Sequence, residues 1–150
     1  MNRTYLISLA ACAALVLPAT ASAKSQTLRF FDKPTDIVLT QADGTVIDHP
    51  PYPDVAPGDT LDIYSLDYAG NHKKHAKKPS ASSHTRCVFS GPGEPTCEAN
   101  VAIGSALLFF KGDSLSVGTG IFRGATGTAT NKNVSDEDNS SDIVVKLHLK

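Results

Sequence analysis

Four glycines lie close together near the end of the chain, in the segment VGTGIFRGATGTA from Val117 to Ala129. Glycine has no Cβ atom, so it weakens a helix or a long flat strand. It suits a tight turn, or a place where two backbones approach closely. The segment therefore predicts a strand that enters a turn and returns as the next strand of a closed sheet.

Alternating apolar and polar residues, which predict strands with one buried face, recur along the rest of the chain. They are clearest in Asp142 to Lys150, where every second residue from Ile143 is apolar. Shorter strands are expected at residues 27–31, 36–40, 60–66 and 86–90, with turn signals such as Asp43-Gly44 between them. Because no stretch after residue 23 shows helical periodicity, we expect an all-β sandwich or barrel.

The segment Glu98 to Phe110 alternates as well, but its pattern changes near Gly104 and Ser105. The change indicates either burial of both faces or a break in the strand. The face expected to be buried comprises Ala99, Val101, Ile103, Leu107 and Phe109.

The first 23 residues have the pattern of a cleaved secretory signal, with an early Arg3, a short apolar run and the ending ATASA. A membrane anchor is an alternative, but the run falls short of the roughly 20 residues that span a bilayer. Lipidation of Cys12 is a second alternative to a cleaved signal. We therefore expect a signal peptide at 1–23, a β-barrel domain at 24–150, no membrane span, and a secreted or periplasmic location.

Two cysteines, Cys87 and Cys97, remain after residue 23 and flank a turn-rich segment. In an exported chain this arrangement predicts a disulfide across a hairpin. A disulfide that closes so short a loop should stabilise the fold by roughly 2 to 3 kcal/mol. A metal or redox pair is the alternative, but the spacing is far from C-x-x-C.

Charge and motifs exclude several classes of function. The net charge of -1 gives no field that would attract nucleic acid. A basic segment at 71–83 and an acidic one at 133–142 are expected to be exposed loops. Lysines beside His72 and His75 would repel a metal, and the acidic segment lacks the glycine and closing Glu of a calcium loop. We expect no metal, no cofactor and no nucleophile-elbow serine.

Two segments carry a resemblance to known families. Ala56 to Lys74, APGDTLDIYSLDYAGNHKK, is similar to the corresponding stretch of the allene oxide cyclase barrel family. Val117 to Ala129 resembles the glycine signature shared by that family and the dirigent proteins. The paired cysteines resemble those of small secreted bacterial relatives. The resemblance covers most of residues 56–150 and implies a calycin-like, eight-stranded antiparallel barrel with an axial cavity. It also implies a homotrimer.

The resemblance implies that the protein handles reactive or apolar small molecules, and it directs attention to two polar residues. Ser65 stands where the cyclases carry an Asn, and Asp32 lies near an acidic residue of both families. Holding a reactive species in a dry pocket needs only one or two such groups. We therefore predict Asp32 and Ser65 as ligand-binding residues, and assign no catalytic residue. The alternatives are a turn residue for Asp32, before Lys33-Pro34, and a small space-filling residue for Ser65.

Three functions remain open at this point. The first is a secreted dirigent-like barrel that binds or orients a small apolar or phenolic ligand. The second is an isomerase of the allene oxide cyclase type, which is the enzyme class we consider. The third is a secreted interaction protein that acts through its charged loops. A cavity of a few hundred cubic ångström would favour the first two, and a filled interior would favour the third.

Overall fold

The computed structural model describes residues 24–91 and 94–150. The expected secretory signal, residues 1–23, lies outside the described residues. Within the described part of the chain, no helix is both long and apolar enough to cross a bilayer.

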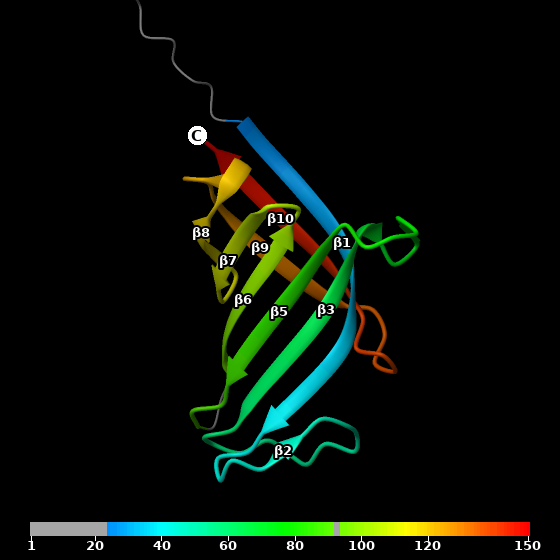
Figure 1. The fold of residues 1–150 in the computed structure, drawn as a ribbon, viewed down its shortest axis with the longest axis vertical. Coiled ribbons are helices and arrows are strands. Elements are labelled where there is room, and N and C mark those ends of the chain that lie inside the picture. Colours follow the sequence, from blue (N-terminus) through cyan, green and yellow to red (C-terminus); the bar gives the residue numbers. More distant parts are fainter. Residues whose placement is uncertain (1–23, 92–93) are drawn as a thin grey trace, which may run out of the picture.

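Strands account for almost all of the regular structure (Figure 1). Their bounds are β1 (Lys24–Thr40), β2 (Val46–Ile47), β3 (Thr60–Asn71), β4 (Lys74–His75), β5 (Ala81–Val88), β6 (Thr96–Ile103), β7 (Ala106–Lys111), β8 (Ser114–Gly118), β9 (Thr126–Asn133) and β10 (Ser141–Leu149). A short 3₁₀ helix, η1 (Gly120–Phe122), lies between β8 and β9.

The strands form a closed antiparallel barrel. Neighbours follow the order β1-β10-β9-β8-β7-β6-β5-β3, and a further pairing of β1 with β3 closes the ring. β2 and β4 are short additions that pair with β1 and β3. The expected all-β, eight-stranded antiparallel barrel is therefore confirmed.

β1 is the strand that closes the barrel. Its first part pairs with β10 and its second part with β3, and Phe30 to Asp32 pair with both. We expected two separate strands here, but they are one. The register shifts between Pro34 and Asp36, and this irregularity accommodates a proline that has no N–H to donate.

The break expected near Gly104 and Ser105 is a tight turn between β6 and β7. It aligns Ile103 with Ala106, so the inward residues of β7 have even numbers. The expected burial of Leu107 and Phe109 is therefore wrong, since both are 36% exposed. Ala106, Leu108 and Phe110 are buried in their place.

The glycine-rich segment forms the predicted strand, turn and strand. β8 ends at Gly118, and a Cβ atom there would clash with the carbonyl oxygen of Phe122. The close approach lets Phe122, which is 1% exposed, pack inside the barrel. It joins Phe30, Leu108, Val145 and Leu147 in the apolar core of the barrel.

We expected the basic segment at 71–83 to be one exposed loop, and this expectation is wrong. It contains the end of β3, all of β4 and the first residues of β5, starting from the buried Ala81. The acidic segment does leave the strands between β9 and β10, although Ser140 and Ser141 at its end are buried.

Candidate functional site

An internal cavity of about 370 Å³ lies in the barrel beside the apolar core. Its wall comes from seven strands, because alternate residues of each strand point inward. The apolar part of the wall includes Ile63, Val101, Phe110, Ile143 and Val145. The polar part includes Asp32, Ser65, Ser83, Thr85 and Ser141. The cavity is thus mainly apolar, with a cluster of oxygen atoms on one side.

Two carboxylates face each other across the strand pair that closes the barrel. Asp32 on β1 is aligned with Asp67 on β3, and their exposed fractions are 7% and 1%. Asp32 lines the cavity, and the Ser83 hydroxyl donates a long hydrogen bond of 3.4 Å to its Oδ1. Among the described residues, neither Asp67 side-chain oxygen has a hydrogen-bond partner of good geometry. Ordinary folds rarely leave a buried carboxylate in this state.

The environment of the pair changes its protonation. Burial, and then the neighbouring Asp32, raise the pKa of Asp67 to about 7. Burial also raises the pKa of Asp32, although interactions with Asp67, Ser65 and Ser83 oppose the change. Two buried carboxylates side by side cannot both ionise without a large cost, so the pair holds one proton near neutral pH. We place that proton on Asp67, because Asp67 is the more deeply buried of the two carboxyl groups.

The structure places both sequence-predicted ligand residues at this cavity. Asp32 lies within β1 and not in a turn, so the turn interpretation is wrong. Ser65 is 6% exposed and is aligned with Pro34 on β1 and Ser83 on β5. Their role in ligand binding stays a prediction. Sequence reasoning missed Asp67, because we expected the strand to end at Leu66. Continuing the alternation of Ile63 and Ser65 by one step would have found it.

The predicted disulfide between Cys87 and Cys97 is confirmed, with an S–S distance of 2.00 Å. The two cysteines are directly opposite each other on β5 and β6, and both line the cavity. The bridge thus ties the wall of the cavity together. Across the part of the chain that the structure describes, no three His, Cys, Asp or Glu side chains gather as a metal site would require.

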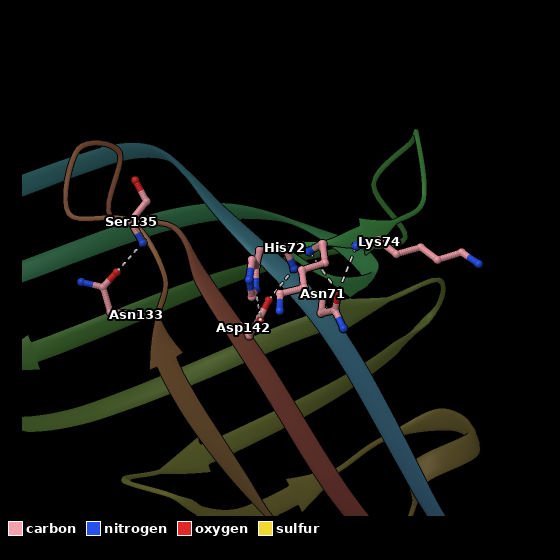
Figure 2. A network of polar contacts seen from close by, with 7 residues as sticks. Asn71, His72, Lys74, Asn133, Ser135 and Asp142 are labelled. Atoms are coloured by element: carbon pink, nitrogen blue, oxygen red, sulfur yellow. Dashed lines mark hydrogen bonds and ion pairs between the residues drawn. The ribbon is translucent and has the colours of Figure 1, made fainter.

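Part of the basic segment is fastened to the outside of the barrel (Figure 2). The backbone N–H of His72 donates to Asp142 Oδ1 at 2.7 Å, and the His72 ring Nδ1 lies 2.6 Å from Asp142 Oδ2. Burial raises the pKa of Asp142, but the hydrogen bonds from His72 outweigh it and lower the pKa overall. The Asn71 side chain accepts hydrogen bonds from the backbone of Lys73 and Lys74. The turn between β3 and β4 is therefore held by Asn71 within it and by Asp142 of β10.

A second hollow, of about 560 Å³, lies on the outer face of β5 to β8. It is lined by His84, Arg86, Asn100, Phe109 and Val117, among others. His84 Nε2 lies 2.7 Å from Asp62 Oδ1, and the His84 ring stacks on Tyr64. The His84 ring thus already has partners within the barrel wall.

Comparison with known proteins gives a relationship of fold. No protein-family model matches the chain, and no curated protein sequence matches it. A solved structure of a pyocyanin demethylase has a TM-score of 0.59 and 15% sequence identity, and the similarity covers 81% of this chain and 99% of that one. At this identity the likeness shows a shared fold alone. The chain is a barrel similar to that of the demethylase, and the comparisons show no membership of the allene oxide cyclase or dirigent families.

Proposed function

We propose that this protein is an exported barrel that binds a small, mainly apolar or phenolic molecule in its cavity and orients it through Asp32 and Ser65. The observation that carries the proposal is the internal cavity of about 370 Å³, apolar along its wall and polar on one side. Small-molecule sites typically have volumes of about 300 to 1,000 Å³ with few polar groups, and this cavity agrees with both features.

The lining explains how such a molecule would be held. Phe110, Ile143, Val145 and Val101 offer apolar area, which contributes roughly 25 cal/mol for each Å² removed from water. Asp32 and Ser65 lie on one side, so a ligand with a polar end has one preferred orientation. A single orientation is what selection of one conformer of a reactive molecule requires.

The structural neighbour supports a small molecule as the ligand. By its name, that protein acts on pyocyanin as a demethylase. Because the two barrels share their fold, the comparison favours ligand binding inside the barrel over the binding of a macromolecule by surface loops. Order in the turn between β3 and β4 argues in the same direction.

Export belongs to the same proposal. Disulfides persist in oxidising compartments, and the Cys87–Cys97 bridge is of that kind. Together with the signal pattern of residues 1–23, it supports a secreted or periplasmic protein.

An isomerase is the second candidate, and the Asp32–Asp67 pair is the observation that favours it. A carboxyl group with a pKa of about 7 can donate or accept a proton at neutral pH, as general acid–base catalysis requires. Turnover of an allene oxide by the wild type, lost in Asp32→Asn, would establish the enzyme. Equal rates and equal product stereochemistry would remove Asp32 from any such mechanism.

The binding function is tested by calorimetric titration of the protein with 1-naphthol. Ala129 lines the cavity, so Ala129→Phe should fill it and weaken binding by about tenfold or more. Thr128→Phe is the matched control, because Thr128 is the exposed neighbour on the same strand and should bind like wild type. Circular dichroism verifies that each variant folds. Equal affinity in Ala129→Phe, or no binding by the wild type, contradicts the proposal.

A further inference from the structure

We propose that the occupant of the cavity carries a basic nitrogen, which is held at the Asp32 carboxylate, and that molecules ending in a carboxylate are rejected. This inference rests on the proposed binding function and names the class of ligand. It goes beyond the apolar or phenolic ligand argued above, because it predicts a charge as well as a shape.

The first observation is the sign of the charge around the cavity. The buried Asp32 lines it, Asp67 lies opposite Asp32 across the closing strand pair, and Asp113 lines it from an exposed position between β7 and β8. Among the described lining residues there is no Lys, Arg or His. Since charges interact more strongly inside a protein than in water, this interior favours a cation and opposes an anion.

The second observation concerns the hydrogen bonding of Asp67 and does not depend on how many charged residues line the cavity. Asp67 is 1% exposed, and neither of its side-chain oxygens has a hydrogen-bond partner in the part of the chain described. A buried carboxylate in this condition is costly unless a donor or a cation compensates it. A protonated amine at Asp32 would supply both the N–H donor and the positive charge that the pair lacks.

Other charged groups near the pair point away from the cavity or have partners outside it. Lys33 follows Asp32 on β1, but it is exposed, and its ammonium group lies over the Phe31 ring. Asp142 on β10 binds His72 on the outer surface. Ser65, Ser83 and Ser141 are the inward groups of β3, β5 and β10 beside the pair, and none of them is ionisable at ordinary pH. Within residues 24–91 and 94–150, no neighbouring cation therefore neutralises the carboxylates from inside the cavity.

The charge of the pair changes with pH in a direction that can be tested. Because the pKa of Asp67 is about 7, the pair carries about one negative charge below that pH and two above it. An alkylamine stays protonated from pH 6 to pH 8. Its affinity should therefore increase over this range, whereas the affinity of a neutral ligand should not change.

The experiment compares three ligands that share one apolar body: 1-naphthylmethylamine, 1-naphthalenemethanol and 1-naphthoic acid. Calorimetry at pH 8 should give the tightest binding for the amine, about tenfold tighter than for the alcohol, since a hydrogen bond to a charged group adds at least that much. The acid should bind more weakly than the alcohol. Between pH 6 and pH 8 the affinity of the amine should increase severalfold.

Variants connect the preference to the pair. Asp67→Asn should remove the pH dependence of the amine's affinity, because Asp32 alone then carries the negative charge over this whole pH range. Asp32→Asn should remove most of the amine preference, because the carboxylate that holds the ammonium group is then neutral. Either variant tests the inference if the other folds poorly. Asp36→Asn is the matched control, because Asp36 is an exposed carboxylate on the same strand.

The outcomes separate this inference from the binding function. If the alcohol or the acid binds as tightly as the amine, the basic-nitrogen inference is wrong and the binding barrel stands. An amine preference that persists unchanged in Asp32→Asn, or a pH dependence that persists unchanged in Asp67→Asn, would also overturn the inference. If none of the three ligands binds the wild type, the inference and the proposed function both fail.

Discussion

Two carboxylates of this barrel are almost equally buried, yet their surroundings differ completely. Asp59, which is 2% exposed, accepts backbone hydrogen bonds from Ala42 at 2.9 Å and from Ala56 at 2.8 Å. Asp67, which is 1% exposed, lies opposite another carboxylate and has no hydrogen-bond partner in the described residues. Burial alone therefore does not identify a functional acid. The partners of the acid distinguish the two cases.

The difference follows from where the two residues lie. Asp59 ends the long connection between β1 and β3, where free backbone N–H groups need acceptors. Asp67 lies within a strand, where backbone groups are already paired by the sheet, so its side chain has no such role. One carboxylate is expected to stabilise the fold, whereas the other is expected to cost stability, a cost that the proposed ligand would offset.

The largest effect is expected from removing the satisfied carboxylate. Asp59→Ala leaves two part-buried N–H groups without acceptors and should lower the free energy of unfolding by about 2 to 3 kcal/mol. Asp59→Asn retains one acceptor oxygen and should lose about half as much. Urea unfolding measures both. A loss below about 1 kcal/mol in Asp59→Ala would show that the connection does not depend on Asp59.

The second prediction concerns pH and the unsatisfied carboxylate. In the unfolded chain the pKa of Asp67 is about 3.9, whereas in the barrel it is about 7. Between these values the folded state binds more protons, so the free energy of unfolding should fall as the pH rises, by about 2 kcal/mol from pH 5 to pH 8. Asp67→Asn should flatten this dependence and stabilise the protein at pH 8.

Thermal unfolding at several pH values tests the second prediction. Its control is Asp36→Asn, in which the pH dependence of the wild type should persist. Loss of stability in Asp67→Asn at pH 8 would mean that the ionised carboxylate has a stabilising partner, and the comparison with Asp59 would then fail.

A third carboxylate, Asp142, tests whether an ordinary paired acid behaves differently from both. It is paired with His72 at the surface, where the two side chains are 20% and 39% exposed. His72→Ala removes the ring contact but keeps the backbone hydrogen bond to Asp142, so the expected loss is below about 1 kcal/mol. Chemical unfolding at low and high salt would measure it. A loss as large as that of Asp59→Ala would contradict this ranking.

The smallest effect is expected from Ser83, which lies beside the Asp32–Asp67 pair. The Ser83 hydroxyl donates its long hydrogen bond to Asp32, which opposes the increase in the pKa of Asp32. Ser83→Ala should change the free energy of unfolding by about 0.5 kcal/mol and raise the pKa of Asp32 further. NMR titration of the Asp32 carboxyl carbon would detect the change. An unchanged titration curve would show that Ser83 does not act on the pair.

Much of the barrel was predictable, because its signals are local. Alternation located β10, and the glycines located the turn between β8 and β9. The break at Gly104 was expected too, but its effect on Leu107 and Phe109 was not. Which face of β7 is buried depends on the alignment across the turn, and that alignment is a property of the paired strands.

The candidate site was predictable only in part, for a related reason. Asp32 and Ser65 could be singled out through a resemblance, but the Asp32–Asp67 pair arises from strand pairing between residues far apart in the chain. Pro34 also suggested a turn, which hid the fact that β1 is continuous. Long-range register determines which side chains share the interior, and no local pattern contains it.

The pairing of Lys24 with Leu149 places the first and last strands edge to edge at one rim of the barrel. A short linker between these positions would therefore allow circular permutation. New termini at the turn between β6 and β7 would preserve every strand pairing. New termini at the irregularity near Pro34 would separate the half of β1 that pairs with β10 from the half that pairs with β3, and only that permutant should lose the closed ring.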